Sequence, residues 1–470
     1  MIDLGIKNGS VVTPNGIIYG GIGVKDSKIV YVGSDHSLPQ CKRIINAQGK
    51  FVIPGLLDPH VHLAGGKDWP TVEEGLRAQF SRETEGALHG GVTTLGHFLR
   101  PPLGTSVTSL LDVASSIGEE LSYIDFIFHA YIIDEIRIAE QAELFRRGVT
   151  SFKHFFNAYT VAERRGLVAP FSEEMLFLSF ESIAKLGSPA IAMCHCEDSG
   201  IAAILMERLQ KAGRDDLRAW TESRPNFVEY IRIAHAVNIA KATRCPLYVV
   251  HVSTAEGSEI INDARRKGYL VWGETCPHYL THTADMESEI GCWGKVNPSL
   301  KYAADNEALW RQIRSGGITS LATDHAAVSI SEKERQGKKQ HNNIWESRLG
   351  ICGGMEHMLP IMMTFGVNAG RISIEDMVRV CSTNTAKTFG IYPRKGALCF
   401  GSDADIVIVD PSKEAVIDEH FYHCEGGCSI YHGWKVKGMA EITIVRGEVM
   451  MEHFQTVGRP GYGKYISRNI

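Results

Sequence analysis

The pattern of hydrophobic and polar positions changes twice along the chain. Up to about residue 53, short β-branched runs alternate with turns such as Thr13-Pro14-Asn15-Gly16. Asn and Gly tolerate the positive φ of tight turns, so this part predicts a small antiparallel sheet. Strands without intervening helices return after about residue 399. We therefore expect a discontinuous β-sandwich domain made of residues 1–53 together with 399–470.

Between residues 54 and 398, apolar runs of strand length alternate with helical patterns, for example over 173–185 and 227–241. Strands that are apolar on both faces and alternate with helices predict a closed parallel sheet. We therefore expect an α/β fold in which residues 54–398 form a (β/α)8 TIM barrel beside the small β-sandwich domain. The eight predicted strands are 51–62, 92–99, 123–132, 150–156, 190–196, 247–252, 270–275 and 319–324.

The last part of the chain, from His453, contains Gly458, Pro460, Gly461 and Gly463. This composition predicts an extended arm, which could pack on a neighbouring subunit.

Composition narrows the possible partners. The 470 residues are 44% hydrophobic, which supports a large core, and the net charge of −5 gives no extended field of one sign. We therefore expect a small-molecule partner, with no nucleic acid and no membrane. The N-terminus has no leader pattern and the eleven cysteines are irregularly spaced, so we expect a cytoplasmic protein with free thiols.

Candidate chemistry lies where the apolar runs stop, and the active site of such a barrel lies at the carboxyl ends of its strands. His60 and His62 are two apart on an extended segment, so both can grip one ion. Lys153, if its surroundings keep it neutral, can add carbon dioxide and become a carbamate that bridges two cations. With His195, His251 and Asp324 at three further strand ends, these residues predict a two-metal hydrolytic site.

Each of these residues also has a structural alternative. A single histidine is more often a core residue than a ligand, and Lys153 could simply extend out of the barrel mouth. Cys194 and Cys196 should point away from His195, because neighbouring strand residues face opposite sides. Cys424 and Cys428 lack a second pair for a metal knuckle, and the charged run 332–339 is a solvated loop or a lid.

Ordered motifs across nearly the whole chain resemble the amidohydrolase superfamily, and within it the cyclic amidases dihydropyrimidinase and hydantoinase. The motifs are Asp58-Pro59-His60-Val61-His62, Ser151-Phe152-Lys153, His195, His251-Val252-Ser253, Glu274-Thr275-Cys276-Pro277, Thr323-Asp324-His325 and Gly401-Ser402-Asp403-Ala404-Asp405.

This resemblance implies two zinc ions per chain, bridged by a carboxylated Lys153. His60 and His62 with Asp324 would hold one ion, and His195 with His251 would hold the other. A hydroxide shared by the two ions would attack the cyclic amide bond of a dihydropyrimidine, hydantoin or related cyclic imide. Asp324 would take its proton and deliver it to the leaving nitrogen. Relatives of this kind are commonly tetramers, so we expect a homo-oligomer, either a tetramer or a dimer.

The substrate contacts depart from the family pattern. In this family a tyrosine five residues after the bridging lysine hydrogen-bonds the substrate. This chain has Ala158 at that position, so we assign the role to Tyr159, because a bulge at the strand end can absorb one residue. Asn297 stands where serine is usual, and Asn343 matches a substrate-contacting asparagine. Ala64 replaces the arginine typical of dihydroorotases, which disfavours dihydroorotate.

The pocket for a ring substituent would be lined by Leu63, Trp69 and Phe155, although such residues at a barrel mouth are more often plain packing. Allantoinase activity, on a more polar ureide, is the second candidate. A non-catalytic scaffold related to this family is the third, and the filled ligand positions weigh against it.

Overall fold

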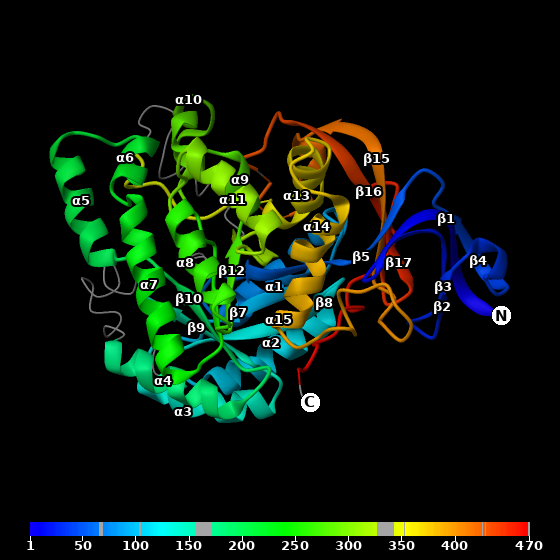
Figure 1. The fold of residues 1–470 in the computed structure, drawn as a ribbon, viewed down its shortest axis with the longest axis horizontal. Coiled ribbons are helices and arrows are strands. Elements are labelled where there is room, and N and C mark those ends of the chain that lie inside the picture. The colour runs from blue at the N-terminus through cyan, green and yellow to red at the C-terminus, as the bar shows by residue number, and fades with distance from the viewer. Residues whose placement is uncertain are drawn as a thin grey trace.

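Two sheets organise the chain (Figure 1). The structure is a computed structural model and describes residues 1–64, 69–102, 105–156, 172–326, 343–351, 353–424, 426–427 and 429–468. One sheet combines strands from both ends of the sequence, and the other is a parallel barrel formed by the middle. The expected barrel with a flanking β-domain is therefore confirmed, and the division of the chain near residues 53 and 399 stays a prediction.

The terminal sheet is mixed and not antiparallel as expected, because β1 pairs antiparallel with β2 but parallel with β4 and β5. Strands β4 and β5 lie end to end along one edge of β1, so the chain returns once to the start of β1, before β4, and then continues along it into β5. Side chains from both parts, such as Ile6 and Ile444, share one apolar core. The strands are β1 (Ile2–Thr13), β2 (Gly16–Lys25), β3 (Lys28–Gly33), β4 (Cys41–Asn46), β5 (Phe51–Pro54), β15 (Ile406–Val416), β16 (Lys435–Val445), β17 (Glu448–Glu452) and β18 (Gln455–Thr456).

The predicted first barrel strand, 51–62, is divided at Gly55. The part before it, β5, pairs with β1 and β15 in the terminal sheet. Gly55 donates its backbone N–H to Asp405, and a Cβ at this position would lie 2.0 Å from the Thr93 hydroxyl oxygen. Only glycine fits this close approach, where the chain leaves one sheet and enters the other.

The barrel sheet follows the order β13-β12-β11-β10-β9-β8-β7-β6-β14. Two short strands share the eighth position: β13 pairs with β12, and β14 pairs with β6, which closes the ring. Between them Asp324 adopts a φ of 50°, which interrupts the strand. The strands are β6 (Leu56–His62), β7 (Val92–Leu99), β8 (Asp125–Tyr131), β9 (Ser151–Phe155), β10 (Ile191–His195), β11 (Leu247–Val249), β12 (Val271–Thr275), β13 (Ser320–Leu321) and β14 (His325–Ala326).

Helices cover the outside of the barrel (Figure 1). The first begins with a capping box in which Thr71 and Glu74 bond each other's backbone N–H. None of the described helices is both long and apolar enough to cross a membrane. The helices are α1 (Val72–His89), α2 (Val107–Leu121), α3 (Glu135–Arg146), α4 (Glu173–Leu186), α5 (Ser199–Lys211), α6 (Leu217–Glu222), α7 (Asn226–Thr243), α8 (Ala255–Arg266), α9 (Pro277–Thr281), α10 (Glu287–Ile290), α11 (Ala303–Ser315), α13 (Gly354–Ile361), α14 (Ile374–Val378) and α15 (Asn384–Thr388).

The last residues of the described chain pack on the barrel of the same chain. Gly461 and Gly463 donate their backbone N–H groups to Ser122 at the end of α2, close to the C-terminus in Figure 1. Arg468 is 2% exposed. The expected arm is present and its described part lies against its own barrel, while packing on a neighbouring subunit stays a prediction.

Candidate active site

The six candidate ligands all lie at the carboxyl ends of barrel strands or just beyond them, as expected for this architecture. Two lie on β6, one on β9, one at the end of β10, one shortly after β11 and one between β13 and β14. In that order they are His60 and His62, Lys153, His195, His251 and Asp324.

The first group contains His60, His62 and Asp324. The Nε2 atoms of both histidines lie 3.1 Å from Oδ1 of Asp324, and the three ligand atoms lie within 4.8 Å of one another. The other nitrogen of His60, Nδ1, is 2.7 Å from Glu274 Oε1. A carboxylate in this position fixes the ring and leaves Nε2 directed at the common point, as is usual for histidine that binds a metal.

The second group is the pair His195 and His251. His195 Nδ1 lies 2.8 Å from His251 Nε2, while His195 Nε2 lies 2.9 Å from Glu197 Oε2. Glu197 therefore orients the ring of His195 as Glu274 orients that of His60. The ring centroids of His60 and His251 are 5.3 Å apart, so the two groups are neighbours.

Lys153 lies beside both groups. Its Nζ is 3.5 Å from His60 Nε2, and it sits 4.8 Å and 5.0 Å from the ring centroids of Phe98 and Phe155. The side chain is fully buried. Burial lowers the pKa of this ammonium to about 8, because the aromatic surroundings solvate its charge poorly.

Burial also sets the protonation of the other groups. It holds the pKa of His60 and of His251 well below the ordinary value, so both imidazoles are neutral and able to donate a lone pair to a cation. Burial alone would raise the pKa of Asp324, but His60, His62 and Lys153 together lower it. Asp324 is therefore a carboxylate at neutral pH.

Two of the candidate ligands have strained backbones. His251 has a φ of 41° and Asp324 a φ of 50°, in the left-handed region that non-glycine residues rarely adopt. Asp58 supports the second, because its carboxylate accepts hydrogen bonds from the backbone N–H, 3.0 Å away, and the hydroxyl of Thr323. Strain of this kind persists where the surroundings impose it, and it is concentrated at functional sites.

Three residues near the ligands were given no role from the sequence. Glu274 begins the motif Glu274-Thr275-Cys276-Pro277, but nothing in the order of the chain pairs it with His60. Glu197 follows His195 by two positions, which is the available local signal for a same-face partner. Phe98 packs on the rings of His60 and His62, with centroids 4.7 Å and 4.9 Å away, and an apolar strand end does not distinguish it from core.

Of the predicted substrate contacts, Phe155 touches a candidate ligand, because its ring stacks on His195 with centroids 5.2 Å apart. Leu63 is 4% exposed and belongs to the main apolar core, while Trp69 is partly exposed. Contact of these residues with a substrate stays a prediction.

The remaining predicted contacts lie in loops. Asn297 and Asn343 are carried by neighbouring segments, since Lys295 Nζ donates to the carbonyl oxygens of Trp345 and Ser347 at 3.2 Å and 2.6 Å. Contact of either asparagine with a substrate stays a prediction. Tyr159, the charged run 332–339 and Cys428 lie outside the described residues. Cys194 and Cys196 are buried in the main core.

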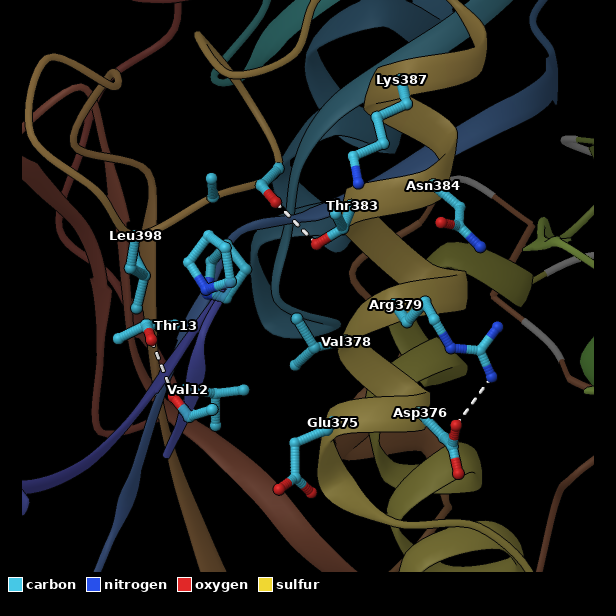
Figure 2. Close-up of a pocket in the computed structure, with 15 residues that line it drawn as sticks. Val12, Thr13, Glu375, Asp376, Val378, Arg379, Thr383, Asn384, Lys387 and Leu398 are labelled. Atoms are coloured by element: carbon cyan, nitrogen blue, oxygen red, sulfur yellow. Dashed lines mark hydrogen bonds and ion pairs between the residues drawn. The ribbon is translucent and has the colours of Figure 1, made fainter. Parts of the chain in front are cut away.

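A cavity of about 320 Å³ lies elsewhere, between the terminal sheet and the helices after the eighth strand (Figure 2). Thr13 and Leu398 line one side, and Glu375, Arg379 and Lys387 line the other. Its Asn384 bonds the carbonyl of Thr319, just before β13, which places the cavity at the amino ends of the strands. None of the six candidate ligands lines it.

Comparison with known proteins gives the family. The model of the Amidohydrolase family matches residues 51–450. The L-hydantoinase of Paenarthrobacter aurescens is 33% identical over 100% of this chain and 98% of its own length. An allantoinase of Rubrobacter xylanophilus is 30% identical over 99% of this chain and 97% of its own length. The solved structure of an L-hydantoinase (dihydropyrimidinase) from Arthrobacter aurescens has a TM-score of 0.91 at 32% identity and covers all of both chains. The chain therefore belongs to the amidohydrolase family, as a hydantoinase-like enzyme that acts on C–N bonds in cyclic amides.

Proposed function

We propose that this chain is a dizinc hydrolase that opens the ring of a dihydropyrimidine, hydantoin or related cyclic imide. The observation that carries the proposal is the convergence of two histidine groups around a buried lysine. His60 Nε2 faces Asp324 at 3.1 Å, His195 Nδ1 faces His251 Nε2 at 2.8 Å, and Lys153 Nζ is 3.5 Å from His60. Nitrogen lone pairs that face one another in a dry site favour cations between them.

The donor atoms fit two divalent cations. His60, His62 and Asp324 would hold one, His195 and His251 would hold the other, and a carboxylated Lys153 would bridge them. Neutral imidazoles and one carboxylate suit zinc, and Glu274 and Glu197 already occupy the ring nitrogens that face away. Two such cations would supply Lewis acidity for the amide carbonyl and a water molecule of lowered pKa.

Lys153 would enter the site as a carbamate. With its pKa near 8, a sizeable fraction of the amine is neutral at physiological pH. The Nζ lone pair then attacks the carbon of carbon dioxide, a C–N bond forms, and one proton is released to water. The product carries two oxygens and one negative charge in place of an ammonium, which changes the lysine from a competitor of the cations into their ligand.

Asp324 would move the proton. It is ionised at neutral pH and its Oδ1 lies 3.1 Å from the Nε2 atoms of His60 and His62, so it can accept the proton of the attacking water. It would then deliver this proton to the ring nitrogen as the C–N bond breaks. The product is an open-chain acid with an amide or ureido end.

The substrate would be held by Tyr159, Asn297 and Asn343, with Leu63, Trp69 and Phe155 around its ring substituent. The aromatic surroundings of Lys153, formed by Phe98 and Phe155, favour a substrate less polar than allantoin. Allantoin hydrolysis stays the second candidate, because an allantoinase is also similar over the full length.

The proposal is tested with purified wild-type enzyme on dihydrouracil, substituted hydantoins, succinimide and allantoin. We expect hydrolysis of at least one of the first three and about two bound divalent ions per chain by metal analysis. Activity on allantoin alone would reverse the ranking of substrates, and a folded protein without metal or activity would support the scaffold alternative. Light scattering tests the expected tetramer or dimer in the same preparation.

A further inference from the structure

The barrel ladder has a gap between β8 and β9. Strand β8 pairs with β7 at six positions, and β9 pairs with β10 at five. Between β8 and β9 the described ladder has two pairs, Ala130 with Phe152 and Tyr131 with Lys153. Strand β9, which presents Lys153, is therefore attached to β8 only near the carboxyl end of β8.

The carboxyl-terminal arm, residues 461–468, fills this gap. The backbone N–H of Phe126 donates to Lys464 at 3.0 Å, and that of Ile466 donates to Phe126 at 2.8 Å. Tyr465 forms a parallel bridge with Phe126. Ile466 is 1% exposed and joins the apolar core formed by the barrel strands. The arm thus acts as a short additional strand along the part of β8 that β9 leaves unpaired.

Arg468, at the end of the arm, joins β8 to β9 directly. Its Nε donates to the Gly148 carbonyl at 3.1 Å, its Nη1 donates to Ser151 Oγ at 2.8 Å, and its Nη2 donates to the Phe128 carbonyl. All three acceptors are uncharged oxygens, and burial lowers the pKa of the guanidinium to about 10. Burying a charge without a carboxylate partner costs free energy. The hydrogen bonds by which Arg468 joins β8 to β9 must therefore offset that cost.

The hydrogen bonds continue from Arg468 towards the ligands. A guanidinium only donates, so Ser151 Oγ accepts from Arg468, and the same hydroxyl is hydrogen-bonded to His129 Nδ1, 2.5 Å away. Burial holds the pKa of His129 well below its ordinary value, so its imidazole is neutral. The ring of His129 packs on Phe98 at 4.9 Å, and Phe98 packs on His60 at 4.7 Å.

We infer that the arm is a positioning element of the active site, in which Arg468 holds β9 against β8 and thereby fixes Lys153 beside His60. The inference rests on the proposed function, because it assumes that Lys153 is the bridging group. Arg468 lies at the amino end of the barrel and touches no candidate ligand. It acts through two routes, the β8–β9 ladder that ends at Lys153 and the path through Ser151 and His129 to Phe98.

The test compares full-length wild type, Arg468→Met and Arg468→Lys, with Arg459→Ala as the matched control. Arg459 is an exposed arginine on the same segment. Metal-free proteins are titrated with zinc by calorimetry, and near-UV circular dichroism verifies the fold. We expect Arg468→Met to bind at least one zinc ion about 10- to 100-fold more weakly, the usual scale for residues behind the ligands. With zinc present, the kcat of Arg468→Met should also fall about 10- to 100-fold while its KM changes little. Arg459→Ala should match wild type in both measurements.

Two further comparisons distinguish an effect on the position of the ligands from a loss of stability. Arg468→Lys should bind zinc with an affinity between those of Arg468→Met and wild type, because lysine keeps the charge but not the fork. A folded Arg468→Met that binds zinc as wild type does would overturn the inference. If that variant does not fold, Ser151→Ala interrupts the same path, and unchanged zinc affinity there would overturn it as well. Wild type that binds no zinc would instead contradict the proposed function.

Discussion

Two fully buried lysines lie at opposite ends of the barrel. Lys153, towards the carboxyl ends of the strands, has the rings of Phe98 and Phe155 around its Nζ and a pKa lowered by burial to about 8. Lys395, at the amino end, binds Asp125 at 2.5 Å and Asp405 at 2.6 Å.

The environments have opposite effects on the two ammonium groups. Burial would lower the pKa of Lys395 too, but its carboxylate partners raise it above the ordinary value. Lys395 is thus a permanent cation that ties the terminal sheet to the barrel, whereas Lys153 loses its proton near pH 8, as the proposed carbamate requires. Burial alone therefore does not tell whether a lysine is structural or reactive. The charged groups that surround its ammonium determine whether its pKa is raised or lowered.

The largest effect is expected from removing the reactive lysine. Lys153→Ala should lower hydrolysis at least about 1,000-fold, because it removes a group that orders the whole reacting centre. Short-chain carboxylic acids added to this variant should restore part of the rate, measured by ring opening. The exposed Lys185, changed to alanine, is the control. An unchanged rate in Lys153→Ala would remove the reactive side of the comparison.

Asp324→Asn should have the next largest effect. Asparagine keeps the shape of the side chain but cannot accept the proton, so kcat should fall about 100- to 10,000-fold. Zinc content is measured on the same samples, because Asp324 is also a candidate ligand. Full activity in a variant that still binds zinc would assign proton transfer to another group.

At the other end, Lys395→Met should affect stability. The change leaves the carboxylates of Asp125, Asp403 and Asp405 without their central cation, and breaking a buried ion pair costs about 3–5 kcal/mol. Urea unfolding of the metal-free protein measures this loss. Lys28→Ala is the control, because Lys28 is a 45% exposed partner of Asp403 and should cost less than about 1 kcal/mol. Equal losses would show that the central position of Lys395 is unimportant.

The smallest effect is a difference in pH dependence. Unfolded lysine holds its proton up to about pH 10.5, whereas folded Lys153 releases it near pH 8, so the unfolded state binds more protons in this window. Metal-free wild type should therefore gain stability relative to Lys153→Met from about pH 7.5 to about pH 9.5. Lys395 contributes no change there, because its raised folded pKa places its loss of stability above pH 10.5. Urea unfolding in carbonate-free buffer measures the stability of wild type and Lys153→Met at each pH. Parallel curves of stability against pH for the two proteins would contradict this expectation.

The reactive end was more predictable from sequence than the structural end. His60, Lys153 and Asp324 stand where apolar runs stop, and the rule that parallel strands deliver residues to one end brings them together. Phe98 has no such signal, since its contact with the ligands depends on ring packing. At the structural end, Asp125 and Lys395 are 270 positions apart, and no local pattern pairs them.

Pairing between distant segments also explains the misjudged parts of the fold. The parallel placement of β4 and β5 on β1 depends on how the chain crosses over, which turn chemistry does not reveal. The arm reads as extended in the sequence, but its place beside β8 follows from a missing stretch of ladder.

The proposed chemistry depends most on a carboxylated Lys153 that bridges the two ligand groups. The direct measurement is ¹³C NMR of zinc-loaded protein equilibrated with ¹³C-labelled bicarbonate, with Lys153→Met as the control. We expect a carbamate signal in wild type that is absent from the variant and disappears when zinc is removed. A zinc-loaded, active wild type without that signal would contradict it.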